Sequence, residues 1–365
     1  MTAVRAVPSP RSWKTLLAAR LTGRAARRTV IAAGAILAGV AALTAAQKVD
    51  VSRLAPHSID VTATSIEFDR AKPGRRDFGR LVWRGSLELR STSPYFGGYS
   101  GLSLDTKGDR LLAVSDAGSW LAAKLGYKDG QLSGLSEARV GAITQKDGRP
   151  LQNPRYRDAE SLAALKEDGI DGRYLISFEG KHRIDEYVFE KGVLSGPVGS
   201  RAVAPNLKRM GNNEGLEAIG LLRGGPYAGA LVMFAEYLLS PQGDHTGAIV
   251  ITGKPSPLYL ARSDDFDIAE IKGLKDGGLL VLERRFIRSA LRLDSRLRLI
   301  RAKDIAPGAR LTGEVLLEAG PGFQIDNFEG MGVSETPRGE TVITLISDDN
   351  FNFFQRTLLV QFLLK

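Results

Sequence analysis

The chain has no cysteine and only three histidines among its 365 residues. The absence of cysteine excludes disulfides, thiolate metal sites and a cysteine nucleophile. The three histidines, His57, His182 and His245, form neither a metal-binding pair at helical spacing nor a recognisable triad. Ser100 is not in a nucleophile elbow, because Leu102 occupies the position of the final glycine. The sequence also lacks a P-loop and a dinucleotide fingerprint, so its chemistry must come mainly from carboxylates and basic residues.

Residues 1–46 contain no Asp or Glu, although they hold seven Lys or Arg. This basic start leads into an apolar run at residues 29–46 that ends in small residues, which is the pattern of an export signal cleaved near Ala46. The run is about 18 residues long, at the lower edge of membrane-spanning length, so an uncleaved N-terminal membrane anchor is the alternative. The pair Arg27-Arg28 leaves Sec and twin-arginine export both open. The sequence therefore predicts a periplasmic or secreted protein, either free or tethered to the inner membrane.

The formal net charge of +9 belongs mostly to this leader, because 9 − 7 leaves +2 for residues 47–365. Such a balance removes the support for nucleic acid as a partner. Residues 47–365 are predicted to form one domain, large enough to bury a core without disulfides. We expect a monomer that acts on a small molecule.

Between Tyr99 and Asn352 the chain repeats one unit five times: a small or acidic loop, a short apolar strand, a turn, and a second apolar strand ending in a carboxylate. The first segments align on Gly101, Glu160, Glu214, Glu270 and Glu329, at intervals of 59, 54, 56 and 59 residues. The second segments close with Asp116, Glu179, Glu236, Glu283 and Asp348. A fixed period of this kind indicates a repeat architecture.

The length of the unit favours an all-β propeller of four-stranded blades over helical repeats. Apolar runs such as LLAV, YLISF and LLVL have the length and composition of strands covered on both faces. Residues 81–89 and 357–364 are predicted to pair in one blade and close the ring, which removes open edges. Residues 51–90 and 289–318 leave room beyond the five visible units, so the sequence predicts six blades.

A carboxylate repeated at one position of every blade becomes a ring of carboxylates around the propeller axis. Like charges so close together need cations, and oxygen-rich sites suit Ca²⁺. The candidate metal ligands are Asp116, Glu160, Glu179, Glu214, Glu236, Glu329, Asp348 and Asp349. Residues 348–352 resemble the opening of a calcium loop, although Phe353 stands where that loop needs glycine. The alternative is a structural function, in which each carboxylate accepts hydrogen bonds at a blade junction.

Basic residues follow two of the terminal carboxylates. Lys181, His182 and Arg183 come after Glu179, and Arg284 and Arg285 come after Glu283. The candidate substrate-binding residues are therefore Lys181, Arg183, Arg284 and Arg285, since arginine binds phosphate or carboxylate in a bidentate manner. The candidate catalytic residues are Glu179 and His182. Ion pairing between neighbouring blades is the alternative explanation for each arginine.

Four pairs of segments resemble the phytase-like family of exported bacterial proteins: GGYSGLSLD with LLAVSDAG, RDAESLAAL with YLISFEGKHRI, NEGLEAI with FAEY, and NFEGMGVS with LISDDNFN. The resemblance covers about residues 81–365. It implies esterase-like activity of phytase type, and a fold similar to that of calcium-dependent propeller phytases, which use Ca²⁺ and basic residues to hydrolyse phosphate esters. The best-matched acidic positions are Glu179, Glu214, Glu329, Asp348 and Asp349.

Three functional hypotheses follow. The first is Ca²⁺-dependent hydrolysis of phosphate or carboxylic esters at the channel mouth, with Arg183 and Arg284 stabilising the developing charge. The second is a lactonase-type esterase that prefers uncharged substrates. The third is a non-catalytic propeller that serves as a binding platform in the cell envelope, where calcium only stabilises the blades.

Overall fold

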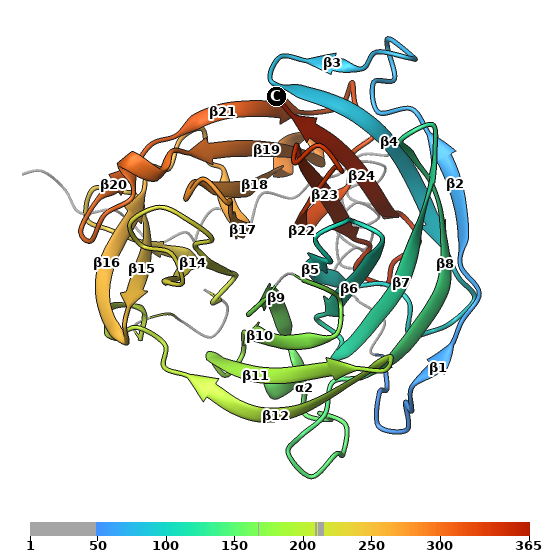
Figure 1. Ribbon diagram of the computed structural model, residues 1–365, viewed down its shortest axis with the longest axis horizontal. Helices are drawn as coiled ribbons and strands as arrows, with labels where there is room; N and C mark the ends of the chain where they lie inside the picture. Colours follow the sequence, from blue (N-terminus) through green and yellow to red (C-terminus); the bar gives the residue numbers. More distant parts are fainter. Residues whose placement is uncertain (1–48, 167, 209, 211–214) are drawn as a thin grey trace, which may run out of the picture. The chain divides into compact units, whose positions relative to one another are not determined.

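The computed structural model describes residues 49–365 except 167, 209 and 211–214. The predicted leader and anchor at residues 1–46 lie outside the described residues, as does Glu214. Within the described residues, no helix has the length and apolarity needed to cross a membrane. The described chain is almost entirely β-structure and forms five small sheets around a central axis (Figure 1).

The first three sheets follow one another along the chain. Blade 1 contains, from the axis outwards, β5 (Tyr99–Leu104), β6 (Arg110–Ser115), β7 (Ser119–Lys128), β8 (Gln131–Ala142) and β1 (His57–Ser58). Blade 2 contains β9 (Ala159–Ala164), β10 (Gly172–Phe178), β11 (Arg183–Glu190) and β12 (Val193–Arg201), with α2 (Pro154–Arg157) before its first strand. Blade 3 contains β13 (Ala218–Leu221), β14 (Leu231–Leu239), β15 (His245–Ile251), β16 (Lys254–Leu260) and the parallel edge strand β20 (Arg310–Leu311), with η2 (Pro205–Leu207) before its first strand.

The last two sheets complete the ring. Blade 4 contains β17 (Asp267–Gly273), β18 (Leu279–Ile287), β19 (Arg292–Ile300) and β21 (Glu314–Ala319), with the short helices η3 (Arg288–Ala290) and η4 (Ala302–Asp304) between them. Blade 5 contains β22 (Asn327–Glu335), β23 (Thr341–Asp348), β24 (Thr357–Leu364), β4 (Leu81–Arg90) and β2 (Thr62–Ile66), and β3 (Asp77–Phe78) also pairs with β4. The inner strands β5, β9, β13, β17 and β22 contact one another in that order, and β22 returns to β5.

The propeller prediction is confirmed, and so is its closure. Strand β24 pairs with β4, from Thr357 opposite Leu89 to Leu364 opposite Leu81, so the two ends of the chain complete one blade. The prediction of six blades is wrong, because the described residues form five. Residues 51–90 contribute β1 to blade 1, and they contribute β2, β3 and β4 to blade 5. Residues 289–318 contribute β19 and β21 to blade 4 and β20 to blade 3. Of these, β4 is the fourth strand of blade 5, and β19 and β21 are the third and fourth strands of blade 4, while β1, β2, β3 and β20 widen sheets that already have four strands.

The hydrophobic core lies between the blades. Each second strand is apolar on consecutive residues, and Leu111 to Val114 in β6 are fully buried. Five clusters fill the junctions, one between each pair of adjacent blades. Because both faces of a blade pack on neighbours, alternation of polar and apolar residues disappears from these strands. The packed blades hold the inner strand ends in place around the axis.

Candidate functional site

One end of the ring gathers the repeated polar residues. Pairing register places Asp116, Glu179, Glu236, Arg284 and Asp348 at equivalent positions, where the second strands of blades 1 to 5 end. Four of these five residues are carboxylates and the fifth is an arginine. The sequence-based alignment placed Glu283 in this set, which is wrong by one residue.

The inner strands contribute a second layer at the same end. In blades 1, 2, 4 and 5 the register shifts near the start of the inner strand, where a bulge accommodates one extra residue. The equivalent residues are Ser100, Glu160, Glu217, Ala269 and Glu329, the third of which directly precedes β13. Two residues earlier in blade 2, Asp158 also faces the group, since its neighbours include Glu160 and Glu329.

We call these residues together the acidic ring. It consists of eight carboxylates: Asp116, Asp158, Glu160, Glu179, Glu217, Glu236, Glu329 and Asp348. Most of them are buried, and the side chains of Asp116, Asp158 and Glu179 are partly exposed. The charge of Glu329 acts on the carboxyl groups of five other members, so the group forms one electrostatic unit.

Arg284 balances one side of the acidic ring. Its Nη2 atom donates to Glu236 Oε1 at 3.0 Å, and its Nη1 atom donates to Asn327 Oδ1 at 2.9 Å and also to Glu329. Glu329 further accepts from Asn327 Nδ2 at 2.8 Å and from the Ser100 hydroxyl at 3.1 Å. Burial lowers the pKa of Arg284, but the surrounding carboxylates raise it more, so its pKa lies well above the ordinary value. Among the described residues, Arg284 is the one cation seen in an ion pair with the ring.

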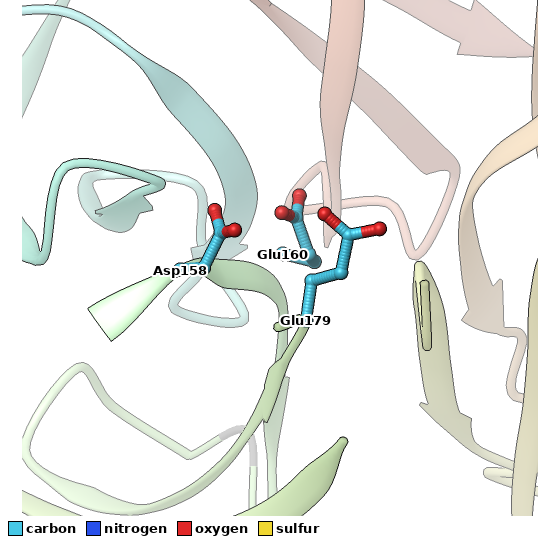
Figure 2. A group of neighbouring side chains, drawn as sticks. All are labelled: Asp158, Glu160 and Glu179. Atoms are coloured by element: carbon cyan, nitrogen blue, oxygen red, sulfur yellow. The ribbon is translucent and has the colours of Figure 1, made fainter. Parts of the chain in front are cut away.

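Three further carboxylates of the ring form a cluster for which no ion pair to a basic side chain is seen in the described residues. Asp158, Glu160 and Glu179 each offer one carboxylate oxygen within 4.8 Å of the others. Figure 2 shows these three carboxylates gathered where β9 begins and β10 ends. Glu179 Oε1 accepts from the backbone N–H of Gly215 at 3.0 Å. A Cβ at Gly215 would lie 2.7 Å from that oxygen, so only glycine lets the Glu179 carboxylate approach this strand.

Crowding and burial raise the pKa of most ring carboxyls. Burial raises the pKa of Asp116 to about 7, and the charges of Glu329 and Asp158 contribute. Burial and the charge of Asp158 raise the pKa of Glu179 to about 7 as well. Burial is also the largest cause of the raised pKa values of the remaining affected members, which are Asp158, Glu160, Glu217 and Asp348. The site therefore has an excess of negative charge that burial disfavours.

Asp349 lies beside the ring and stabilises a loop. Its Oδ1 atom accepts from the backbone N–H groups of Gly98 and Phe351, both at 3.0 Å, and its Oδ2 atom accepts from the Thr357 hydroxyl at 2.8 Å. Asn352, the third member of the proposed calcium loop, accepts from backbone N–H groups farther along the same turn. These bonds hold the segment between β23 and β24 against blade 1.

Three of the predicted basic residues have partners outside the ring. Arg183 donates to Asp185 at 2.6 Å and stacks over Phe178, with 3.7 Å from its guanidinium carbon to the ring centroid. Arg285 donates to Asp294 at 2.6 Å. Lys181 is exposed and donates to the Tyr156 hydroxyl at 3.3 Å. His182, partly buried, lies in the same turn between β10 and β11.

Sequence reasoning identified most of the ring but missed two of its carboxylates. Asp158 and Glu217 were not predicted, although DAES, GLEA and NFEG share a glutamate followed by a small residue, a pattern that aligns Glu160, Glu217 and Glu329. Arg284 was predicted to bind substrate, whereas the structure also places it in the blade position that carries a carboxylate elsewhere. Glu283 instead forms a buried ion pair with Arg298.

The residues of the acidic ring fit a hard divalent cation. The donors are all oxygens, and Ca²⁺ accepts six to eight such ligands in flexible geometry. Eight carboxylates face one guanidinium, and burial and mutual repulsion raise the pKa of six of them, so a bound cation would offset their negative charge. The oxygens of Asp158, Glu160 and Glu179 lie within 4.8 Å of one another, and no ion pair to them is seen in the described residues, so this cluster is the best place for a metal.

Two solved structures are similar to the chain at low sequence identity. Among solved structures, the chain is similar to an endo-arabinase from Bacteroides thetaiotaomicron VPI-5482, at 14% identity and a TM-score of 0.44, covering 72% of this chain and 92% of that one. It is also similar to a protein provisionally described as a gluconolactonase, at 10% identity and a TM-score of 0.37, covering 87% of this chain and 96% of that one. No curated protein matches the chain.

The family comparison is more specific. Residues 94–351, well over half of the chain, match the family model named Phytase-like and described as "Esterase-like activity of phytase". The match covers all five inner strands and the whole acidic ring. It supports an esterase-like, hydrolytic function for the propeller. The chain thus belongs to the phytase-like family.

Proposed function

We propose that this protein is a calcium-dependent hydrolase of phosphate or carboxylic esters, and that the reaction takes place at the acidic ring. The observation that carries the proposal is the cluster of Asp158, Glu160 and Glu179, whose oxygens converge within 4.8 Å without a neighbouring ion pair in the described residues. A cluster of this kind holds its charge at neutral pH only with a cation nearby.

Different residues of the ring would bind the metal and stabilise the substrate. Asp158, Glu160 and Glu179 would hold Ca²⁺, with Asp116, Glu217 and Asp348 close enough to add to its electrostatic stabilisation. Bound calcium supplies Lewis-acid polarisation of an ester oxygen and a water of lowered pKa. Arg284 is held by Glu236, Glu329 and Asn327, so its guanidinium is positioned to stabilise negative charge that develops on the substrate.

A carboxyl with a pKa near 7 can also move a proton at neutral pH. In the calcium-free site Glu179 has this property, and its partial exposure gives water access to the carboxylate. Once it binds calcium, the same carboxylate acts as a ligand and not as the proton carrier. His182 is three residues further along the same turn and remains the second candidate for proton transfer. The residues Lys181, Arg183 and Arg285 are left as secondary candidates for substrate contact, because their observed bonds are to other parts of the protein.

The proposal includes a location outside the cytoplasm. Its basis is the leader in residues 1–46, which has the composition of an export signal. Mass spectrometry of the protein recovered from fractionated cells would identify the mature N-terminus. A start near residue 47 in the periplasm or medium supports cleavage and release, whereas an intact leader in the membrane fraction supports a tether.

The central experiment measures hydrolysis of phytate, aryl phosphates and aryl esters in calcium and in chelator. We expect turnover that chelator abolishes and that calcium restores. Glu160→Gln should remove the calcium dependence and most of the activity, because it deletes one charge from the cluster, while Asp304→Asn at an exposed carboxylate should not. If calcium raises the melting temperature but no ester is turned over, the binding-platform hypothesis replaces this one.

A further inference from the structure

Exposed aromatic side chains surround the end of the propeller that carries the acidic ring. The described residues include five such side chains: Tyr156 (38% exposed), Tyr237 (49%), Phe286 (54%), Phe353 (96%) and Phe354 (72%). We call them the aromatic collar. The chain has fourteen phenylalanines, and the other eleven are buried or partly buried, so exposure is concentrated in this group.

Sequence position ties the collar to the ring in four blades. Tyr156 precedes Asp158 by two residues in blade 2, and Tyr237 follows Glu236 directly in blade 3. Phe286 follows Arg284 by two residues in blade 4. At about 3.3 Å of rise per strand residue, the Cα atom of each of these collar residues lies within roughly 7 Å of the Cα atom of a ring residue. The collar therefore extends outwards from the same end of the blades.

Phe353 and Phe354 stand on the loop between β23 and β24 in blade 5. The bonds of Asp349 to Gly98 and Phe351 fix this loop, and Phe351 packs on the core between blades 5 and 1. The rings of Phe353 and Phe354 are perpendicular at 5.9 Å and face solvent. A firmly held loop that presents two phenylalanines to water indicates a contact surface, because exposure of such side chains costs free energy without a ligand.

Tyr237 connects the collar with the ring. Burial raises the pKa of its hydroxyl, and the charges of Glu236 and Arg284 act on it, which places the phenol beside the ion pair. Half of the side chain remains exposed. A ligand bound at the ring would thus meet polar groups at its reacting end and aromatic faces around the rest.

The charge of the ring indicates what such a ligand cannot be. Eight carboxylates and one arginine repel a polyanion, even when one divalent cation is bound. Two other basic residues near this end are engaged, Arg183 with Asp185 and Arg285 with Asp294. An inositol polyphosphate, which is compact and highly charged, matches neither the ring nor the collar.

We propose that the collar binds an apolar, ring-containing part of the substrate, and that the substrate class is esters with one small reacting head joined to an aryl or similarly bulky apolar group. This inference rests on the proposed hydrolytic function for the identity of the head. We assign the collar to substrate binding and not to membrane binding, because the adjacent acidic ring would repel anionic lipid head groups.

The test compares substrates that share a reacting group and a leaving-group acidity but differ in apolar size. Phenyl phosphate is compared with biphenylyl phosphate, and phenyl acetate with biphenylyl acetate. For at least one pair, we expect kcat/KM to be roughly tenfold higher for the biphenylyl ester, a preference that aromatic contacts of this size provide. In the double variant Phe353→Ser/Phe354→Ser this preference should fall towards one.

A matched control shows that the effect is local. Val198→Ser removes an exposed apolar side chain from β12, the outermost strand of blade 2, and should leave the preference unchanged. Melting curves of both variants should coincide with the wild type, since all three side chains face solvent. Equal kcat/KM for the two esters of both pairs in the wild type, or an unchanged preference in the double variant, overturns the proposal.

A binding measurement separates this inference from the proposed hydrolysis. Methylphosphonate and biphenylylphosphonate are not turned over, and their affinities in calcium are measured by calorimetry. Tighter binding of the biphenylyl compound that the double variant loses supports the collar even if no ester is hydrolysed. Equal affinities refute it. Sedimentation with vesicles of phosphatidylcholine and phosphatidylglycerol tests the other occupant: vesicle binding that depends on Phe353 and Phe354, with unchanged phosphonate affinities, assigns the collar to a lipid surface and overturns the proposal.

Discussion

Replacing Asp116 with asparagine should stabilise the calcium-free protein at alkaline pH. Burial raises the pKa of this carboxyl from 3.8 to about 7. In the unfolded chain the group ionises near its ordinary value, so between these two pKa values the folded protein binds more protons than the unfolded one. The free energy of unfolding therefore falls as pH rises through this window, and the cost is complete above about pH 7. Asparagine keeps the shape of the side chain and removes the charge.

The size of the effect follows from the shift. A shift of about 3 pKa units at 1.36 kcal/mol per unit sets an upper limit of about 4 kcal/mol. Neighbouring carboxyls titrate together with Asp116, and Asp116 is partly exposed. We therefore expect the substitution to raise the free energy of unfolding by about 1–3 kcal/mol. For a domain of this size such a gain raises the melting temperature by several degrees, roughly 2–4 °C per kcal/mol.

The assay is thermal unfolding in chelator at about pH 5 and about pH 8, below and above the raised pKa. Wild type, Asp116→Asn and the surface control Asp304→Asn are compared, and each is then titrated with calcium. The Asp116 variant should gain stability mainly at the higher pH and lose part of the calcium-induced rise in melting temperature. Equal destabilisation at both pH values, or an undiminished calcium effect, would refute the electrostatic account of the ring.

Two further substitutions test separate parts of the site. Arg284→Met leaves Glu236 and Glu329 without their cation, so in chelator at about pH 8 it should cost about 3–5 kcal/mol in urea unfolding. Calcium should recover part of this loss, and a variant as stable as the wild type would show that the arginine does not balance the ring. Glu270→Gln should also destabilise the fold, because Lys272 loses a partner at 2.7 Å. It should leave the calcium-induced shift of the melting temperature unchanged, since the bonds of Glu270 are to Ser161 and Lys272; a reduced shift would extend the metal site into the channel.

Much of this architecture was predictable because the sequence repeat reflects a structural repeat, the blade. Each blade must bury the same second strand on both faces, so LLAV, YLISF and LLVL recur with apolar residues on both faces of the strand. Ring closure was predictable for the same reason, since residues 81–89 and 357–364 have the composition of blade strands without partners nearby in the sequence. The number of blades was not predictable, because the sequence of a short edge strand such as β20 does not indicate which sheet the strand joins.

The ring was predicted least well where the backbone is irregular. A β-bulge adds one residue to a strand, so counting along the sequence loses register with the partner strand. In blade 4 the register pairs Asp267 with Arg284 and Ile268 with Glu283, so Arg284 occupies the ring position and Glu283 forms its ion pair with Arg298. The alignment on carboxylates alone selected the wrong neighbour. A pattern that allowed a charge of either sign at this position would have found Arg284.

The arginine of blade 4 explains why the site is asymmetric. Five identical blades would place five equivalent carboxylates around the axis and give a cation no preferred side. Arg284 instead neutralises the sector of blades 3 and 5, through Glu236 and Glu329. Blade 4 lies across the five-membered ring from the junction of blades 1 and 2, and Asp158 and Glu160 belong to blade 2. Under the proposed function, the arginine of this one repeat would leave the sector of Asp158 and Glu160 to bind a divalent cation.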